Sequence, residues 1–253
     1  GVDAAIIFSD ILVAVAAMGA HLELDDGGPR LAPVRDAAAV EALIVPDPSE
    51  GVPFLLEAVR QTRRALAGKV PLIGFCGAPI TLAAYLVEGG NSKTFNALKS
   101  LCFAAPEVAH RLLEKLARTV ALQLRAQVEA GAQAVQVFDS WGGLFGPADY
   151  REFGLPYLQQ IFADLAGAGV PRILFATASS TLLEIMAESG ADVIGVDWRI
   201  DLAEARRRLG PARPVQGNLD SACLFGPPAL IAARAAEVLR QGAASGAGRG
   251  HIF

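Results

Sequence analysis

Cysteine and histidine are scarce in this sequence of 253 residues, which has three of each. The cysteines stand far apart, and neither a CxxC pair nor a cluster of His and Cys occurs; they are Cys76, Cys102 and Cys223. Disulfide frameworks and structural zinc sites need several closely spaced ligands, so the sequence predicts neither. We therefore expect no metal site. Buried free thiols in a reducing cytosol fit this pattern, and we expect a cytoplasmic protein.

A surplus of basic residues is also absent. Lys and Arg number 22 and Asp and Glu number 26, which gives a net charge of -4. A protein that binds nucleic acid normally carries a basic surplus, so we expect no nucleic-acid partner. A small anionic ligand remains compatible with this charge, because a few local arginines can outweigh a mildly negative total.

No uninterrupted apolar run is long enough for a membrane span, although the mean hydropathy is high at +0.39. The most apolar stretch covers residues 4–20 and contains Ser9 and Asp10 at its middle. A carboxylate at that depth in lipid is costly, and no basic region precedes the stretch as in a signal peptide. We interpret it as a buried strand followed by a buried helix, in a protein with no membrane partner.

The nucleotide-binding signatures GxGxxG and GxxxxGK[ST] are missing, although short apolar runs alternate with longer amphipathic ones. Seven runs are typical of strands: 4–9, 71–75, 134–138, 172–176, 192–196, 213–217 and, weakly, 251–253. Seven others predict helices: 54–66, 81–87, a long one from Pro106, 149–165, 181–188, 202–209 and 229–240. A hairpin is expected around Asp26 and Gly27, where Asp and Gly cluster.

Repeated strand–helix units predict a parallel sheet with right-handed crossovers. An α/β fold of the TIM-barrel type, (β/α)₈, needs eight strands to close. The simplest account is one barrel domain over residues 1–253, incomplete at both termini, with the first strand and the last helix outside this sequence. An open doubly wound sheet is the alternative.

Chemistry in such a barrel gathers where strands end, so polar residues directly after apolar runs are candidates. Asp10 is the sharpest of them, because it lies between two apolar segments. It could equally cap the helix that follows. The other candidates are Asp139, Ser140, Trp141, Thr177, Asp197, Trp198, Arg199, Asn218 and Asp220.

Each of these candidates also has an ordinary structural interpretation. Asp139 and Ser140 precede two glycines and could form a polar turn, while Asp197 and Arg199 could pair with each other. Tyr85 could be a core aromatic with a hydrogen-bonded hydroxyl. The three histidines share no local spacing and are interpreted as structural. No lysine follows an apolar strand, which argues against a Schiff-base aldolase.

Five blocks of this sequence resemble, in order and at compatible spacing, the signature blocks of the uroporphyrinogen decarboxylase family. They are AAIIFSDILV, PLIGFCGAPITLAAYLVEGG, VFDSWGG, GVDWR and PVQGNLD, and the resemblance covers residues 4–253. It implies a (β/α)₈ barrel, usually a homodimer, that acts in haem and chlorophyll synthesis. The family converts the four acetate side chains of uroporphyrinogen III to methyl groups, which gives coproporphyrinogen III and CO₂, without a metal or organic cofactor.

The resemblance also assigns roles to individual residues. The Asp of the FSD block, Asp10, is implied to be the catalytic carboxylate that stabilises charge on the pyrrole nitrogens. Tyr85 and Ser140 are implied to bind the substrate. Phe8 and Ile7 lie on the same strand as Asp10, and their backbone is expected near the pyrrole ring.

The sequence departs from the family pattern in three places. It contains neither the RQAGRY-type block, whose arginines meet substrate carboxylates, nor the NLGHG-type block with its pocket histidine. His251 precedes the position of that histidine and does not inherit its role. FATASST also differs from the segments often found there. Two alternatives follow: a truncated, non-catalytic paralogue that binds porphyrin or only dimerises, and a zinc-dependent methyltransferase, which lacks its HxC ligand pair here.

Overall fold

The fold was analysed in a computed structural model, which describes residues 2–7, 9–25, 28–210, 212–243 and 250–253. Within these ranges the main sheet has seven strands, in the order β1-β4-β5-β6-β7-β8-β9, and every neighbouring pair is parallel. The strands are β1 (Ala5–Ile6), β4 (Leu72–Gly77), β5 (Ala134–Asp139), β6 (Arg172–Ala176), β7 (Val193–Gly195), β8 (Val215–Gln216) and β9 (His251–Ile252). All seven predicted strands are confirmed.

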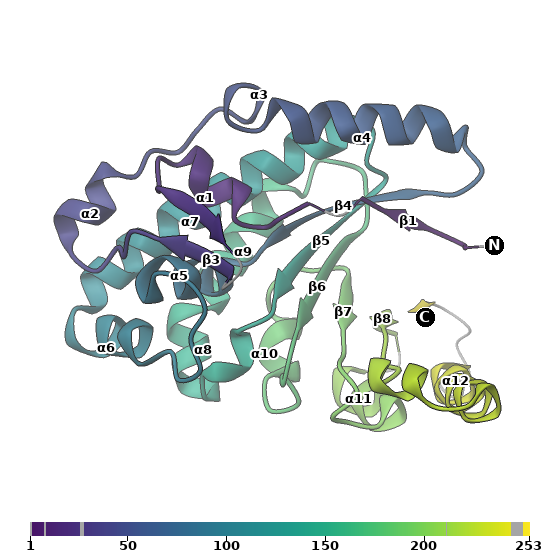
Figure 1. Cartoon of the computed structure of the whole chain (residues 1–253). Helices are drawn as coiled ribbons and strands as arrows, with labels where there is room; N and C mark the ends of the chain where they lie inside the picture. The colour runs from purple at the N-terminus through teal and green to yellow at the C-terminus, as the bar shows by residue number, and fades with distance from the viewer. Residues whose placement is uncertain (1, 8, 26–27, 211, 244–249) are drawn as a thin grey trace.

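The sheet curls as part of a barrel, and Figure 1 shows β4 to β8 side by side in this order. Among the described residues β1 and β9 form its two edges, and no strand joins them. The predicted α/β architecture of the TIM-barrel type is confirmed as a curled parallel sheet of seven strands among the described residues. That residues 1–253 make up a single barrel domain stays a prediction.

The two faces of the sheet differ because successive side chains on a strand point to opposite sides. On one face Cys76 contacts Gln123 of the longest helix, and Val135 and Val137 are fully buried. On the other face Phe75 and Phe138 pack edge to face with ring centres 5.5 Å apart, and Phe175 lies 5.9 Å from Phe138. The first face packs on helices, and the second lines the inside of the curl.

The longest helix, α7 (Pro106–Glu129), follows the apolar spacing predicted for it. Leu112, Leu116, Val120 and Leu124 are all at most 1% exposed. Pro106 occupies the first turn, where its missing N–H is harmless, and Gly131 follows the helix with φ +119°. The helix packs against α5 (Pro79–Glu88), α9 (Leu155–Asp164) and the strands β4 and β5, so it anchors the outer layer.

The predicted helix over 149–165 is in fact two helices, α8 (Pro147–Phe153) and α9. The chain turns at Gly154, where a Cβ atom would lie 2.9 Å from both the ring and the carbonyl oxygen of Tyr150. The remaining helices are α1 (Val13–Ala17), α2 (Ala37–Ala42), α3 (Pro48–Gly51), α4 (Pro53–Leu66), α6 (Asn96–Ala104), α10 (Leu183–Ala187), α11 (Leu202–Leu209) and α12 (Pro228–Ala243), with 3-10 turns at Gly142–Leu144 and Ser221–Phe225.

A separate hairpin lies between α1 and α2, as the sequence predicts. Strands β2 (Leu22–Asp25) and β3 (Gly28–Leu31) pair antiparallel, with Leu22 opposite Leu31. The turn residues Asp26 and Gly27, on which the prediction rested, lie outside the described residues. Across the ranges that the structure describes, no helix is both long and apolar enough to cross a membrane.

Candidate active site

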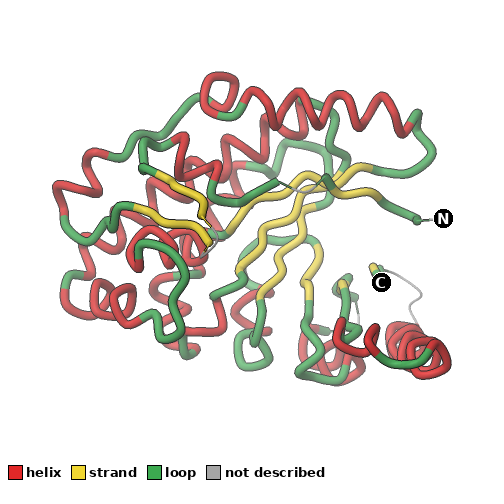
Figure 2. The backbone as a smooth tube through the Cα atoms, viewed as in Figure 1, coloured by secondary structure: helices red, strands yellow, loops and turns green. Residues whose placement is uncertain are grey.

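Strands of the curled sheet run beside one another (Figure 2), and because every neighbouring pair is parallel, the carboxyl ends of all seven lie at one edge of the sheet. The segment that follows β1 therefore meets those that follow β4 and β5. Gly77, the last residue of β4, confirms this proximity, since a Cβ atom there would lie 3.3 Å from Cβ of Ile11. The edge brings together the regions of Asp10, Tyr85 and Ser140.

Asp10 is half-buried in the turn between β1 and α1. Its Oδ1 accepts a hydrogen bond from the backbone N–H of Leu12 at 2.8 Å, and its carbonyl oxygen accepts one from the N–H of Val13 at 3.3 Å. These bonds form the turn that leads into α1, which begins at Val13 with Leu12 as its N-cap and no side-chain cap, so the prediction that Asp10 caps the helix is wrong. Among the described residues Oδ2 has no hydrogen-bond donor, so half of the carboxylate is free for a ligand.

Of the two predicted strand residues Ile7 and Phe8, the structure describes only Ile7. The Ile7 side chain is half-buried against the apolar cluster formed by Leu55, Leu56 and Val59 of α4. It therefore points to the helical layer, and a contribution to a ligand can come only from its backbone. Phe8 lies outside the described residues.

Tyr85 and Ser140 are both close to Trp141. Tyr85 belongs to α5 and is half-buried, and its ring centre is 6.4 Å from that of Trp141. The ring centre of Phe95 lies 4.6 Å from that of Trp141. Ser140 directly precedes Trp141 and is also half-buried. Neither the Tyr85 nor the Ser140 hydroxyl has a hydrogen-bond partner within the described part of the chain, so both can serve a ligand.

Asp139, the last residue of β5, is 1% exposed and lies on the helical side of the sheet. Its Oδ1 accepts from the Thr81 hydroxyl at 2.8 Å, and its Oδ2 accepts from the Tyr150 hydroxyl at 2.9 Å. Burial raises the pKa of the carboxyl to about 6, although both hydrogen bonds oppose this shift. Sequence reasoning found Asp139 at its strand end but missed its two partners, because α5 and α8 bring them from distant segments.

The two glycines after Trp141 are explained by close contacts rather than by a ligand. A Cβ atom at Gly142 would lie 2.6 Å from Oδ2 of Asp139, and one at Gly143 would lie 2.4 Å from the carbonyl oxygen of Thr177. Only glycine allows the backbone to pass between these neighbours. The loop after β5 is therefore wedged between the buried carboxylate and the loop after β6.

The loops after β6, β7 and β8 are joined through Asp197, whose side chain is 1% exposed. Its carboxylate accepts from the N–H of Ala178 at 2.6 Å and from Arg199 at 2.5 Å, so the predicted pairing of Asp197 with Arg199 is confirmed. The Arg199 guanidinium also lies 4.3 Å from the ring centre of Trp198. Asn218 donates to the carbonyl oxygen of Asp197 at 3.0 Å.

Comparison with known proteins identifies this arrangement. A family model described as uroporphyrinogen decarboxylase (URO-D) matches residues 1–253. A uroporphyrinogen decarboxylase of Myxococcus xanthus is 52% identical over 254 residues, covering 100% of this chain and 72% of the relative. One from Escherichia coli is 48% identical, covering 99% of this chain and 72% of the relative. The chain belongs to the uroporphyrinogen decarboxylase family.

A solved structure supports the fold of this family member. A methyltransferase from Methanosarcina mazei superimposes with a TM-score of 0.81, covering 95% of this chain and 72% of that chain. The two sequences are 22% identical, so the similarity concerns the fold alone. It places the curled seven-stranded sheet among barrel-like α/β proteins and carries no argument about chemistry.

The cysteines and histidines of this family member are spread through the fold. Burial raises the pKa of the Cys76 thiol and of the Cys102 thiol to about 12, which keeps both in the neutral form. His251 contacts the carbonyl oxygen of Gly217, and His110 bonds to Tyr157 at 2.6 Å. Across the described ranges no group of three or more His, Cys, Asp and Glu is arranged to hold a metal ion.

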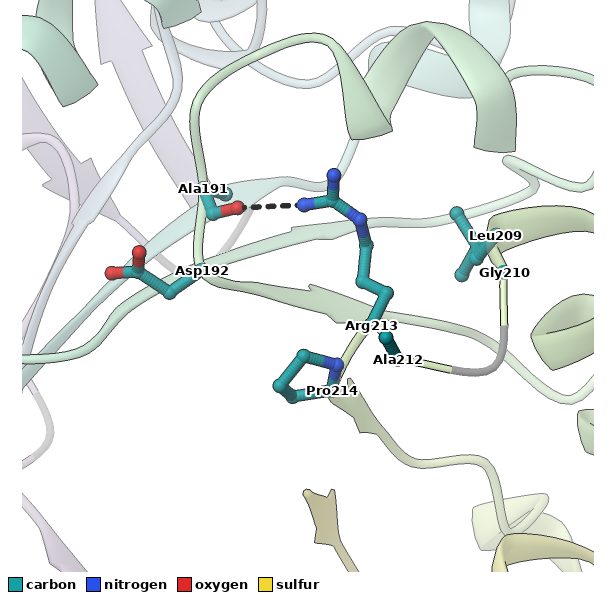
Figure 3. A pocket seen from close by; sticks show the side chains of 7 residues that line it. All are labelled: Ala191, Asp192, Leu209, Gly210, Ala212, Arg213 and Pro214. Carbon is teal, nitrogen blue, oxygen red and sulfur yellow. Dashed lines mark hydrogen bonds between the residues drawn. The ribbon is translucent and has the colours of Figure 1, made fainter. Parts of the chain in front are cut away.

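Two surface hollows lie near the later strands, at opposite edges of the sheet. One, of about 440 Å³, lies at the amino ends of β7 and β8, where Arg213 donates to the carbonyl oxygen of Ala191 (Figure 3). The other, of about 470 Å³, lies at the carboxyl ends beside Trp198 and Asn218, next to α12. Only the second hollow is on the edge that holds the candidate site.

Proposed function

We propose that this chain removes the four acetate carboxyl groups of uroporphyrinogen III as CO₂ and leaves methyl groups, which gives coproporphyrinogen III. The observation that carries the proposal is the position of Asp10, in the FSD block of this family, just after β1, with one oxygen that accepts from no donor among the described residues. Tyr85 and Ser140, whose hydroxyls have no partner in that same part of the chain, support the same site from α5 and from the loop after β5.

The reaction balances without an external oxidant or reductant. A proton adds to the pyrrole α-carbon next to the carbon that bears the acetate, and the resulting cation, conjugated to the acetate-bearing carbon, is the electron sink. The bond between the CH₂ group and the carboxylate then breaks, CO₂ leaves, and the electron pair moves into the ring. A proton adds to the CH₂ carbon and the first proton is lost, so each cycle consumes one proton net.

The proposed roles of the three residues follow from their charges. Positive charge develops over the pyrrole nitrogens when the ring is protonated, and the fixed carboxylate of Asp10 stabilises it. The hydroxyls of Tyr85 and Ser140 donate to substrate carboxylates, which orients the macrocycle. The porphyrinogen itself provides the electron sink, so the proposed reaction uses neither a metal nor an organic cofactor. A cytoplasmic homodimer is part of the same proposal.

Product analysis tests the proposal directly. The chain is incubated anaerobically with uroporphyrinogen III, and the oxidised porphyrins are separated by chromatography. A second protein joins the chain to the segments that flank the matching region in the Myxococcus xanthus relative, because the RQAGRY-type and NLGHG-type blocks do not occur in this sequence. Porphyrins with seven, six, five and four carboxyl groups are expected from the joined protein. A folded joined protein that forms none of them would contradict the proposal.

A substitution of Asp10 tests the assigned role in the same assay. Asp10→Asn removes the charge that faces the ring, and turnover is expected to fall by about 10²–10³-fold while the fold is retained. Asp3→Asn, the same change at an exposed position of the same segment, is the matched control. Equal turnover by the two variants would exclude Asp10 as the catalytic carboxylate.

A further inference from the structure

Thr81 and Tyr85 lie one turn apart on α5 and therefore on the same face of the helix. This face meets the segment after β5 at two points. The Thr81 hydroxyl donates to Asp139 and accepts from the backbone N–H of Trp141 at 3.1 Å, while the Tyr85 ring packs near the indole of Trp141. Thr81 thus bridges the buried carboxylate and the residue against which Tyr85 packs.

This bridge is one of the contacts that position Trp141. Its indole N–H is buried and has no acceptor in the described part of the chain. The ring packs against Tyr85, Phe95 and the apolar core, while the backbone N–H donates to Thr81 and the carbonyl oxygen accepts from Leu144. A change in the Thr81 bond should therefore move Trp141, and with it the adjoining Ser140.

The carboxylate that orients Thr81 is itself held from two further directions. Tyr150 of α8 donates to Oδ2 of Asp139, and the backbone of Gly142 closes the space beside that oxygen. Asp139, Thr81 and Tyr150 are each at most 1% exposed. Water and substrate have no access to this group, so it cannot take part in the reaction by contact.

We propose that Asp139 is a positioning residue, which acts through Thr81 to hold Trp141 and Ser140 against Tyr85. The inference rests on the proposed function, since Tyr85 and Ser140 are the residues proposed to bind the substrate, and its binding depends on the distance between them. Two hydroxyls on different elements must converge on carboxylates of one macrocycle, and the Asp139–Thr81 bond fixes the relation between those elements.

Protonation of Asp139 gives this arrangement a measurable signature. Tyr150 from α8 is the only titratable side chain in contact with the carboxyl group among the described residues, while α5 presents the neutral Thr81 and the loop presents the Gly142 backbone. The pKa of about 6 means that mild acid neutralises the carboxyl group and turns one of its two oxygens into a donor. The charge-assisted bonds from Thr81 and Tyr150 then weaken or rearrange, and the Thr81 bond to Trp141 is expected to shift with them.

Fluorescence of Trp141 tests the relay without requiring activity. The sequence has two tryptophans, and Trp198→Phe leaves Trp141 as the only one, which is excited selectively at a wavelength that tyrosine does not absorb. We expect its emission to change with a midpoint near pH 6. Asp139→Asn should abolish the transition, Thr81→Val should weaken it severely, and Thr81→Ser, which keeps the hydroxyl, should restore it. A flat reference curve, or a transition that survives Asp139→Asn, would overturn the proposal.

Substrate kinetics provide the second readout, in the joined protein used for the product assay. Thr81→Val should raise KM for uroporphyrinogen about tenfold with a smaller effect on kcat, and Thr81→Ser should stay near the reference value. Equal KM values for the two variants would show that the hydroxyl only packs. If the reference protein itself is inactive, the proposed function fails, whereas the fluorescence titration still decides whether Asp139 positions Trp141.

Discussion

At the scale of single residues, the most informative group is one that does not touch the proposed substrate. Asp139 sits behind the strand-end surface, and its burial sets it apart from Asp10, which is half-buried and keeps one oxygen free. Two carboxylates at strand ends on the same edge of the sheet therefore have different tasks. One can meet a charge that develops on a ligand, and the other keeps its surroundings in place.

The raised pKa of Asp139 predicts how stability changes with pH. The folded carboxyl has a pKa of about 6 against 3.8 for the unfolded one, so between these values the folded state binds more protons. Its contribution to the free energy of unfolding therefore falls as pH rises from about 4 to 6, by about 3 kcal/mol in total, and is constant above. Urea denaturation across this range should show that the free energy of unfolding of Asp139→Asn rises relative to that of the unsubstituted chain as pH rises. A constant difference between the two would contradict the shift.

Single residues also show where sequence reasoning succeeds and where it ends. Asp10, Asp139, Ser140 and Asp197 can be predicted as strand-end residues, because each follows an apolar run in a parallel sheet. The pairing of Asp197 with Arg199 is predictable because the partners are two positions apart. The bond between Thr81 and Asp139 spans 58 positions and depends on how α5 docks, which no local pattern encodes.

At the scale of elements, the segments that follow β5, β6 and β7 are in direct contact with one another. The loop after β5 lies against the loop after β6 through Gly143, and the loop after β6 is bonded to Asp197 after β7. The sequence predicted the strands and most helices because their apolar spacing is regular. It missed the division at Gly154 and the short helices α2, α3 and α6, whose ends are set by contacts with neighbouring elements.

Gly143 offers a test of this packing between loops. Gly143→Ala would place a Cβ atom 2.4 Å from the carbonyl oxygen of Thr177, a backbone atom that cannot move aside easily. We expect the free energy of unfolding to fall by about 1–3 kcal/mol. Gly146→Ala is the control, because its φ is -70° and a Cβ atom there meets nothing within 4 Å. Urea denaturation that finds both variants equally stable would contradict the close contact.

At the scale of the whole molecule, α7 connects the early and late parts of the chain. It packs against α1, α2, α3 and α4 from the first part, and against α8 and α9 from later segments. Its spacing was predictable from sequence alone, whereas the set of elements that it touches was not, because partners of an apolar stripe are chosen by the three-dimensional fold. The stability of the whole sheet should therefore respond to this one helix.

Leu124 tests that dependence, since it lies on the buried side of α7 and is fully buried. Leu124→Ala should lower the free energy of unfolding by about 2–5 kcal/mol through lost burial and the cavity that remains. Leu122→Ala, two positions earlier and 41% exposed, should change it by about 0.5 kcal/mol or less. Circular dichroism and tryptophan fluorescence should report the same urea midpoint for each variant. Different midpoints from the two probes would show that the parts of the chain that α7 contacts do not unfold in a single cooperative transition.

The order of the strands in the sheet has a consequence for how the protein is made. Strands β4 to β9 each join a neighbour that comes just before or after them in the sequence, but β1 pairs with β4, where Ala5 meets Leu72 after 67 further positions. Closing so long a loop is entropically unfavourable until β4 exists as a partner. During synthesis on the ribosome Asp10 is made before β4, and β1 has no partner in the sheet until β4 follows, so the proposed catalytic carboxylate takes its position only after that later strand exists.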